Sequence, residues 1–160
     1  MSATTSSPSP PNPATPRRPF RKTRNRDQIG RTEDVYFGTT FRASVGYSST
    51  AFGARDAAWF LTGEVAHGSE YAPGREWWLA AAGSGRLAQG RLEDALASGQ
   101  VRHYWRLGRR NVLFAAVTAT VSEDLDPDRQ LTLGGENGLR GYPLRYQSGD
   151  SSVLVTLEHR

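Results

Sequence analysis

Few residues of this chain have the types and spacing that catalysis or metal binding requires. There is no cysteine, which excludes a disulfide framework, a thiolate metal site and a cysteine nucleophile. The three histidines, His67, His103 and His159, lie too far apart in the sequence to form a local metal-binding motif. We therefore expect no metal site that depends on cysteine or histidine ligands.

Acidic residues occur in two arrangements that could hold a cation or act in acid–base catalysis. Three aspartates alternate over residues 124–128 and could ligate calcium, but Pro127 interrupts them and no downstream glutamate completes an EF-hand. Glu93 and Asp94 are adjacent, so in a strand their carboxylates point to opposite faces and cannot share acid–base work. We expect a solvated acidic loop in the first case and no catalytic pair in the second.

Glycine-rich stretches also lack the spacing of known catalytic motifs. Ser84 stands between Gly83 and Gly85, without the Gly-x-Ser-x-Gly spacing of a nucleophile elbow. Residues 134–138, with the sequence GGENG, match neither a dinucleotide fingerprint nor a phosphate loop. The sequence therefore predicts no catalytic residue, no cofactor and no metal, and the chain is not expected to be an enzyme.

The elements that position these residues are predicted by a period of two in hydrophobicity, which is the period of a β-strand. From residue 34 onward, apolar side chains fall mainly on odd positions and polar ones on even positions. Turn residues separate the segments as an antiparallel meander requires, and only one connection, about residues 123–150, is long. We predict an all-β fold, an antiparallel meander of about six long strands, from these segments: 34–47, 56–65, 76–86, 91–107, 113–122 and 152–160.

The fourth segment contains the weakest part of this pattern. Leu92 and Leu96 fall on even positions, and residues 93–96 could instead form a helical turn. The sequence leaves the start of that strand open between these two interpretations.

The length of the strands bears on the kind of β-protein. Segments of about ten or more residues exceed the usual five or six of soluble sheets, whereas roughly 9–11 tilted residues cross a bilayer. Aromatic residues near the segment ends, such as Tyr47, Trp77 and Tyr104, would then lie at the membrane interfaces. Periodicity alone fits a soluble antiparallel sandwich or open barrel equally well, and no apolar run is long enough for a transmembrane helix.

Residues 1–33 differ in composition from the rest of the chain. They hold six of the nine prolines and seven of the twenty basic residues. We therefore expect a disordered, Pro-rich basic tail followed by a β-domain over residues 34–160. The basic run at residues 17–26 could be a nucleic-acid arm or a twin-arginine export signal, but no apolar stretch follows it and the rest of the chain adds no net positive charge. A solvated basic tail is the preferred interpretation.

The long connection carries the most specific pattern in the chain. Within eight residues, four glycines surround one arginine, Arg140. We expect the backbone to bend sharply at Gly134, Gly135 and Gly138, and we expect Gly141 to let the chain pass close to another wall. A tight turn of this kind would present the guanidinium to a carboxylate.

The tip of the long loop carries a four-residue motif that resembles a known family. The motif is preceded by two glycines and followed by a strand that ends in the sequence LEHR at residues 157–160. Together these features resemble the bacterial surface-antigen superfamily, which includes outer-membrane assembly proteins and two-partner-secretion transporters. The residues that match the tip motif of that superfamily are Leu139, Arg140, Gly141 and Tyr142.

The resemblance implies a sixteen-stranded antiparallel transmembrane β-barrel whose long loop folds back into the lumen. Arg140 would reach into the lumen and pair with an acidic residue of the barrel wall. Independently of the resemblance, the aromatic residue that flanks the turn, Tyr142, is expected to pack beside the Arg140 guanidinium. Glu158 matches the position of one such acidic partner. The period of two independently places Glu158 on the polar face.

By this resemblance, the chain is expected to be a piece of an outer-membrane pore that inserts or translocates polypeptides. Its expected partners are the bilayer of the bacterial outer membrane and the unfolded or secreted polypeptide substrates, and no nucleic acid is expected. Six strands are too few to close a barrel in a bilayer, for which about eight is the smallest number. We therefore expect a fragment of a larger barrel, from a truncated or misassigned reading frame or an excised piece, without an export signal of its own.

Two alternatives come from other classes of protein. The first is a soluble all-β binding domain with a basic arm for nucleic acid. The second is a barrel that is fused to an enzyme in a longer parent protein. Periodicity alone cannot separate the soluble domain from the barrel, because the strands of soluble sheets also alternate. The fused barrel can be recognised only from the sequence that flanks this chain in the parent.

Overall fold

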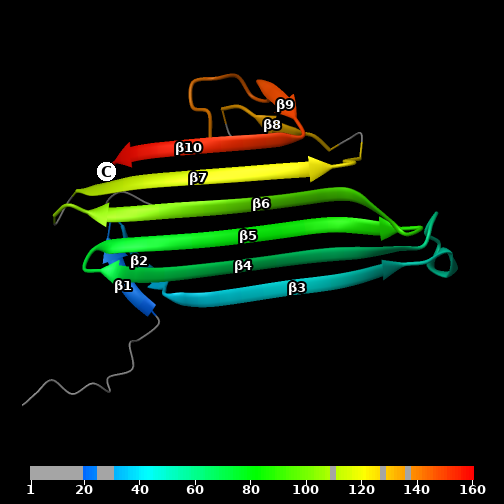
Figure 1. Ribbon diagram of the computed structural model, residues 1–160, viewed down its shortest axis with the longest axis horizontal. Coiled ribbons are helices and arrows are strands. Elements are labelled where there is room, and N and C mark those ends of the chain that lie inside the picture. Colours follow the sequence, from blue (N-terminus) through cyan, green and yellow to red (C-terminus); the bar gives the residue numbers. More distant parts are fainter. Residues whose placement is uncertain (1–19, 25–30, 109–110, 127–128, 136–137) are drawn as a thin grey trace, which may run out of the picture.

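The structure is a computed structural model that describes residues 20–24, 31–108, 111–126, 129–135 and 138–160 (Figure 1). Its body is one six-stranded antiparallel sheet with the strand order β10-β7-β6-β5-β4-β3. This sheet confirms the all-β class and the six-stranded meander that the period of two predicted. Its strands are β3 (Gly38–Ser48), β4 (Ala58–Ala72), β5 (Arg75–Ala88), β6 (Arg91–Arg106), β7 (Val112–Glu123) and β10 (Ser151–His159).

The connections distinguish the two ends of the sheet. At the end that we call the turn end, β4 joins β5 through Pro73 and Gly74, and β6 joins β7 through residues 107–111. At the opposite end, the loop end, a short 3-10 helix (Thr50–Phe52) follows β3, and a two-residue turn joins β5 to β6. The long connection 124–150 also leaves from the loop end and contains β8 (Leu131–Leu133) and β9 (Gln147–Gly149). The connection between the predicted segments 56–65 and 76–86 is therefore shorter than expected, because β4 continues to Ala72 and β5 begins at Arg75.

The two faces of the sheet differ in polarity as the sequence predicted. Cross-strand partners on β3, β4 and β5 share the same parity, so odd residues occupy one face and even residues the other. We call the odd face the outer face and the even face the inner face. Along β3, for example, Phe41 and Val45 lie on the outer face, while Arg42 and Ser44 lie on the inner face.

A β-bulge in β6 explains the segment where the sequence pattern was weakest. Ser84 pairs with Leu96, but Arg86 pairs with Glu93, so β6 contains one extra residue at this point. Asp94 lies in the bulge with a positive φ of 48°. The parity of β6 reverses there, which puts Leu92 on the outer face and leaves Leu96 on the inner face. The alternative of a helical turn at residues 93–96 is therefore wrong.

A small hairpin covers part of the inner face. It consists of β1 (Phe20–Arg24) and β2 (Thr32–Tyr36), which pair with each other and not with the main sheet. The prediction of a disordered tail over residues 1–33 is thus wrong for Phe20–Arg24 and for the start of β2, while residues 1–19 and 25–30 lie outside the described residues. The segment predicted at residues 34–47 is also divided in two, between β2 and β3.

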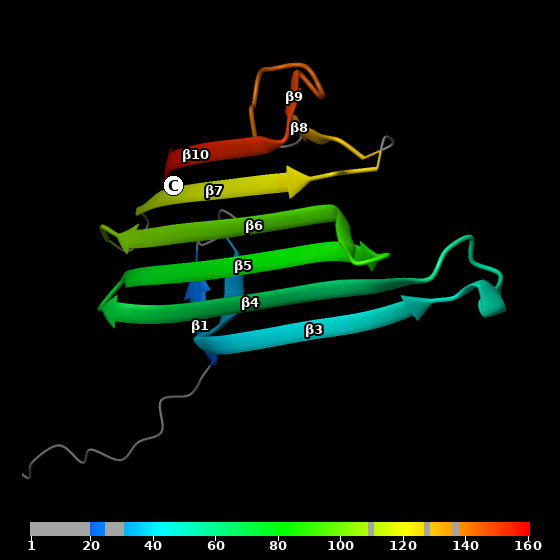
Figure 2. The ribbon, with the colours of Figure 1, turned by 45° about the vertical axis from the view of Figure 1, so that its right-hand side comes forward.

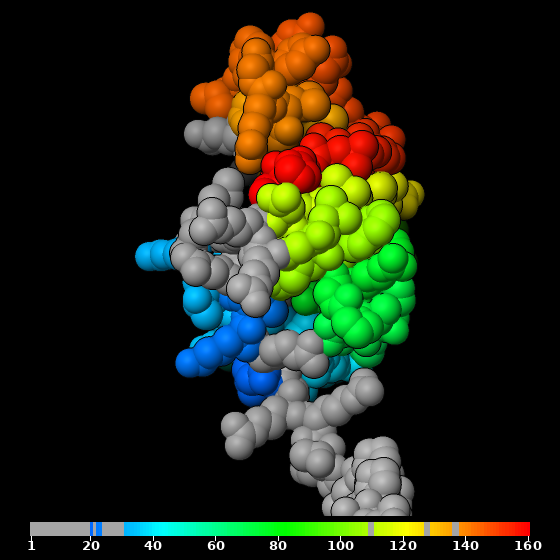
Figure 3. All heavy atoms as spheres, turned by 90° about the vertical axis from the view of Figure 1, so that its left-hand side faces the viewer, coloured from blue at the N-terminus to red at the C-terminus, as the bar shows by residue number. Residues whose placement is uncertain are grey.

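One cluster of buried side chains lies on the inner face near the turn end. Tyr104, Val112, Phe114 and Ala116 form a cluster, and Trp78 packs against it. The hairpin approaches the same region, because Phe37, at its end, packs its ring 5.6 Å from that of Trp78. A cavity of about 290 Å³ lies between the two layers and is lined by β2 residues and by inner-face residues of β3, β4, β5 and β6. Seen along the strands, the hairpin lies to one side of the sheet (Figure 3).

The sheet remains open within the described residues. The edge strands β3 and β10 lie at opposite sides of the sheet and do not pair with each other (Figure 2). Since the sheet has six strands, these two edges run in opposite directions. No helix in this part of the chain is long and apolar enough to cross a membrane.

Candidate functional site

The long loop folds back on itself and holds the predicted tip motif. Strands β8 and β9 pair at its base, and the Gly135 amide donates to the Pro143 carbonyl at 3.2 Å. A β-carbon on Gly134 would lie 2.5 Å from the Arg145 nitrogen and 2.6 Å from the Pro143 oxygen. The two arms of the loop therefore approach so closely that only glycine fits at this position.

The tip of the loop lies on the inner face of β10. Gly138 has a φ of 98°, and a β-carbon there would overlap the side chain of Leu154. Gly141 behaves differently: its φ is 89°, but a β-carbon there would have no neighbouring atom within 4 Å. Gly141 therefore makes a left-handed turn, and the expectation that it passes close to another wall is wrong. Gly138 and Gly134 make the close approaches instead.

The structure brings Arg140 and Glu158 together. Arg140 Nη2 lies 3.8 Å from Glu158 Oε1, and Glu158 is on the inner face opposite Phe114. The Arg140 side chain is 88% exposed, whereas that of Glu158 is 27% exposed. An exposed pair at this distance contributes little to stability, at most about 1 kcal/mol. The pair nevertheless shows that the loop tip lies beside Glu158, on the inner face of β10.

Glu158 has a second and closer basic partner that the sequence interpretation missed. Arg160 Nε donates to Glu158 Oε2 at 2.7 Å, and the Arg160 side chain is only 12% exposed. The Arg160 guanidinium also lies 4.3 Å from the centre of the Phe114 ring, a cation–π contact. The sequence signal for this partner was parity, since residues 158 and 160 share the even, inner face.

The other tip residues, Leu139 and Tyr142, form hydrogen bonds and a ring contact within the loop. The Leu139 amide donates to the Gly134 carbonyl at 3.1 Å, and the Tyr142 amide donates to the Leu139 carbonyl at 3.2 Å. The Tyr142 ring packs 5.0 Å from the Tyr146 ring, so Tyr146 is the aromatic neighbour of Tyr142. These bonds give the tip a defined shape within the loop.

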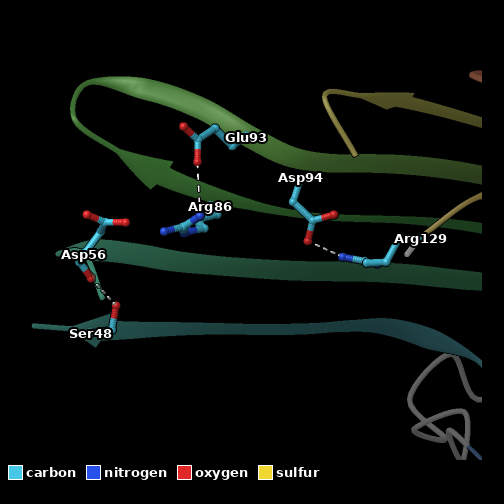
Figure 4. A network of polar contacts seen from close by, with 6 residues as sticks. All are labelled: Ser48, Asp56, Arg86, Glu93, Asp94 and Arg129. Carbon is cyan, nitrogen blue, oxygen red and sulfur yellow. Dashed lines mark hydrogen bonds and ion pairs between the residues drawn. The ribbon is translucent and has the colours of Figure 1, made fainter. Parts of the chain in front are cut away.

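The base of the loop is tied to the bulge in β6. Arg129 Nη1 binds Asp94 Oδ2, and the Asp94 amide donates to the Asp124 carbonyl at 2.8 Å. Figure 4 shows Asp94 and Arg129 facing each other, beside the pair that Arg86 and Glu93 form at 3.2 Å. The base of the loop is thus bonded to the sheet at this bulge. No sequence motif predicted this attachment.

The acidic residues at the start of the loop do not form a metal site in the described part of the chain. No group of three His, Asp or Glu residues there could hold a metal ion. Asp128 lies outside the described residues, so the alternating aspartates cannot be compared as a set.

Outside the buried cluster, polar side chains pair across the strands of the inner face. Arg42 pairs with Glu64 at 2.6 Å, and Ser44 bonds Thr62 at 2.6 Å across the same two strands. Gln100 donates to Thr118 at 2.9 Å on the far side of the sheet. Short side chains lie between these pairs and line a shallow cavity of about 220 Å³; they include Thr62, Ala82, Ser84 and Ser98. The inner face therefore suits contact with water and with polar chain segments.

The outer face is apolar and is not covered by any other described element. Phe41 is 76% exposed, Val155 is 63% exposed and Leu157 is 72% exposed. Monomeric soluble proteins rarely expose a contiguous apolar patch of more than a few hundred Å². Other large exposed side chains in the outer rows are Val45, Leu61, Val65, Leu79, Leu87, Val101, Val117, Val121 and Val153.

Aromatic side chains border this apolar face at both ends. Tyr47 and Trp59 pack at the loop end with ring centroids 4.6 Å apart, and Trp77 packs 4.3 Å from His103 at the turn end. Trp59 and Ser69, the partner of Trp77, are ten residues apart on β4. Ten residues span about 33 Å along a strand, or about 25 Å across a membrane at the tilt of barrel strands. That height matches the apolar band of outer-membrane barrels.

Comparisons of the chain with protein-family models, with curated proteins and with solved structures found no match. Any function must therefore be argued from the geometry of the two faces and of the loop. The two faces indicate whether lipid or water contacts each side of the sheet. The loop indicates what occupies the space beside the polar inner face.

Proposed function

We propose that the six-stranded sheet is part of the wall of an outer-membrane β-barrel. The observation that carries this proposal is the exposed apolar outer face, bordered by aromatic residues about 33 Å apart along β4, which is about 25 Å across a membrane at the tilt of barrel strands. A transmembrane barrel has this arrangement, with alternate residues facing lipid and lumen. The inner face, with its arginine and glutamate pairs, would then face the lumen.

The position of the second layer favours a barrel over a soluble sandwich. In a sandwich, the second layer covers the apolar face of the sheet, because burial of apolar surface drives the packing. Here the hairpin packs against inner-face residues, and Gly138 of the loop packs on inner-face Leu154. The outer face stays uncovered by either element.

A complete barrel needs more strands than this sheet contains. Unpaired edges such as those of β3 and β10 cannot remain in the hydrocarbon core, because their backbone groups would lack partners. We infer that further strands close the wall, and the resemblance of the loop tip to the surface-antigen superfamily favours a total of sixteen. The opposite directions of the two edges allow antiparallel closure, by further strands or, for the chain alone in vesicles, by other copies of the chain.

The long loop supports a role in moving polypeptides. In the proposed barrel, Arg140 and Gly138 hold the tip against the inner wall, at Glu158 and Leu154. A loop braced in this way narrows the lumen without catalytic chemistry. We propose that the barrel inserts or translocates unfolded polypeptides, which pass the polar inner face or pair with an open strand edge.

Fractionation of bacteria that produce the chain behind an added export signal tests the membrane placement. We expect the chain in the outer-membrane fraction, with migration in detergent gels that changes on heating, as barrels retain their hydrogen-bonded sheet in detergent. A soluble monomer that binds DNA, with an affinity that falls steeply with salt, would instead support the binding domain with a basic arm. A soluble monomer that binds neither membranes nor DNA would contradict both the barrel and the nucleic-acid-binding domain.

A further inference from the structure

The outer face carries very few charges, and their placement is uneven. In the regularly paired outer rows of the six described strands, Arg75 and Glu123 are the only residues with charged side chains. Arg75 begins β5 at the turn end, opposite Trp105, and Glu123 ends β7 at the loop end, opposite Ala95. The outer face is therefore cationic at one border of its apolar band and anionic at the other.

Arg75 has no acidic partner among the described residues. Its guanidinium lies 4.8 Å from the centre of the Trp105 ring, and its charge also acts on the nearby His103 imidazole. The nearest carboxylates in sequence, Glu70 and Glu76, lie on the even, inner side of the sheet, and Glu70 accepts a hydrogen bond from the Gly74 amide. The charge of Arg75 is thus presented on the outer face without a counterion from the sheet.

The rows beside Arg75 change in polarity step by step. One pair further along β5 and β6, Trp77 stands opposite His103, which the Tyr71 hydroxyl contacts at 3.0 Å. The next outer pair, Leu79 and Val101, is aliphatic. A cation, then aromatic rings, then aliphatic side chains is the order in which a membrane changes from headgroups to hydrocarbon.

We propose that Arg75 and Trp105 bind the phosphate of an anionic phospholipid headgroup at the turn end of the barrel. The inference rests on the proposed function, since it requires the outer face to contact lipid. Arginine binds phosphate oxygens with two parallel N–H donors, and the Trp105 ring holds the guanidinium in place. A lipid fits better than free phosphate because its acyl chains would cover the adjacent leucine and valine rows. Glu123 would repel the same headgroup at the loop end.

The test measures which lipid lies next to Trp105. The full chain, with its other three tryptophans replaced by phenylalanine, is folded into phosphatidylcholine vesicles that contain a minor fraction of brominated phosphatidylglycerol or brominated phosphatidylcholine. Bromine quenches tryptophan emission on contact. We expect stronger quenching by phosphatidylglycerol, by about the fivefold enrichment that one basic residue near a membrane surface provides. Arg75→Gln should abolish the difference, while Arg55→Gln, at an exposed arginine of the loop end, should preserve it.

The outcomes separate this inference from the proposed function. Equal quenching by the two brominated lipids, both in the chain that retains Arg75 and in Arg75→Gln, overturns the headgroup site but leaves the lipid contact intact. Loss of the difference on addition of inorganic phosphate would show a site for free phosphate rather than for lipid. Quenching by neither lipid would contradict the membrane placement itself. If the variant with three tryptophans replaced by phenylalanine does not fold, the unaltered chain is used instead. The comparison is then between its contacts with spin-labelled phosphatidylglycerol and with spin-labelled phosphatidylcholine.

Discussion

Val117→Arg is expected to destabilise the membrane-inserted sheet by about 2–4 kcal/mol, the cost of arginine at the lipid-facing midplane of a barrel. Val117 lies near the middle of β7 on the outer face, and its partners on both sides, Val101 and Val155, are apolar and exposed. No polar group of the neighbouring strands could satisfy the guanidinium there. The measurement is the free energy of unfolding in urea of the chain folded into vesicles.

Thr120→Arg is the matched control on the same strand. Thr120 lies on the inner face between Ser98 and Ser152, so a new arginine there would face the polar side of the sheet. We expect a change of about 0.5 kcal/mol or less, as for other solvated positions. The comparison also separates the alternatives. In a soluble sheet with the outer face in water, Val117→Arg would be as mild as Thr120→Arg, and that result would contradict the lipid-facing assignment.

Gly134→Ala is expected to open the long loop while leaving the six-stranded sheet intact. The added methyl group would meet backbone atoms of Pro143 and Arg145, which have no flexible side chain to move aside. Overpacking of this kind typically costs about 1–3 kcal/mol. We expect the amides of Gly135, Leu139 and Tyr142, which are hydrogen-bonded within the loop, to exchange with deuterium more than about tenfold faster.

Two matched variants define how specific this effect is. Gly141→Ala meets no neighbouring atom, so only its left-handed φ is strained, at about 1–2 kcal/mol. Arg140→Ala removes only an exposed pair and should change exchange at the loop amides by a smaller factor than Gly134→Ala. If Arg140→Ala opened the loop as far as Gly134→Ala, the ion pair and not the glycine packing would hold the loop together.

The period of two was sufficient to predict the architecture of the sheet. It placed Phe41 and Leu157 on one face and Arg42 and Glu158 on the other, because each side chain's direction follows from its position along a strand. The same parity put Glu158 on the inner face, within 3.8 Å of the arginine that the loop motif indicated. Local rules therefore sufficed wherever the pairing was regular.

Parity failed where pairing becomes irregular or depends on distant residues. The bulge at Asp94 adds one residue to β6 and reverses the parity of Leu92, and a single sequence does not mark which residue is extra. The β1–β2 hairpin was missed because its sequence is polar and basic, and its place depends on packing against Trp78. Arg160 was not predicted as a partner of Glu158, because the loop motif indicated only Arg140.

The central claim, that the outer face meets lipid and the inner face meets water, can be measured one residue at a time. The chain has no cysteine, so single cysteines at residues 117–122 of β7, beyond the buried cluster that contains Phe114 and Ala116, can each carry a spin label without a background signal. In vesicles, accessibility to oxygen should peak at odd residues, and accessibility to a water-soluble nickel complex should peak at even residues. A uniform profile, or nickel accessibility that peaks at the odd residues, would contradict the account.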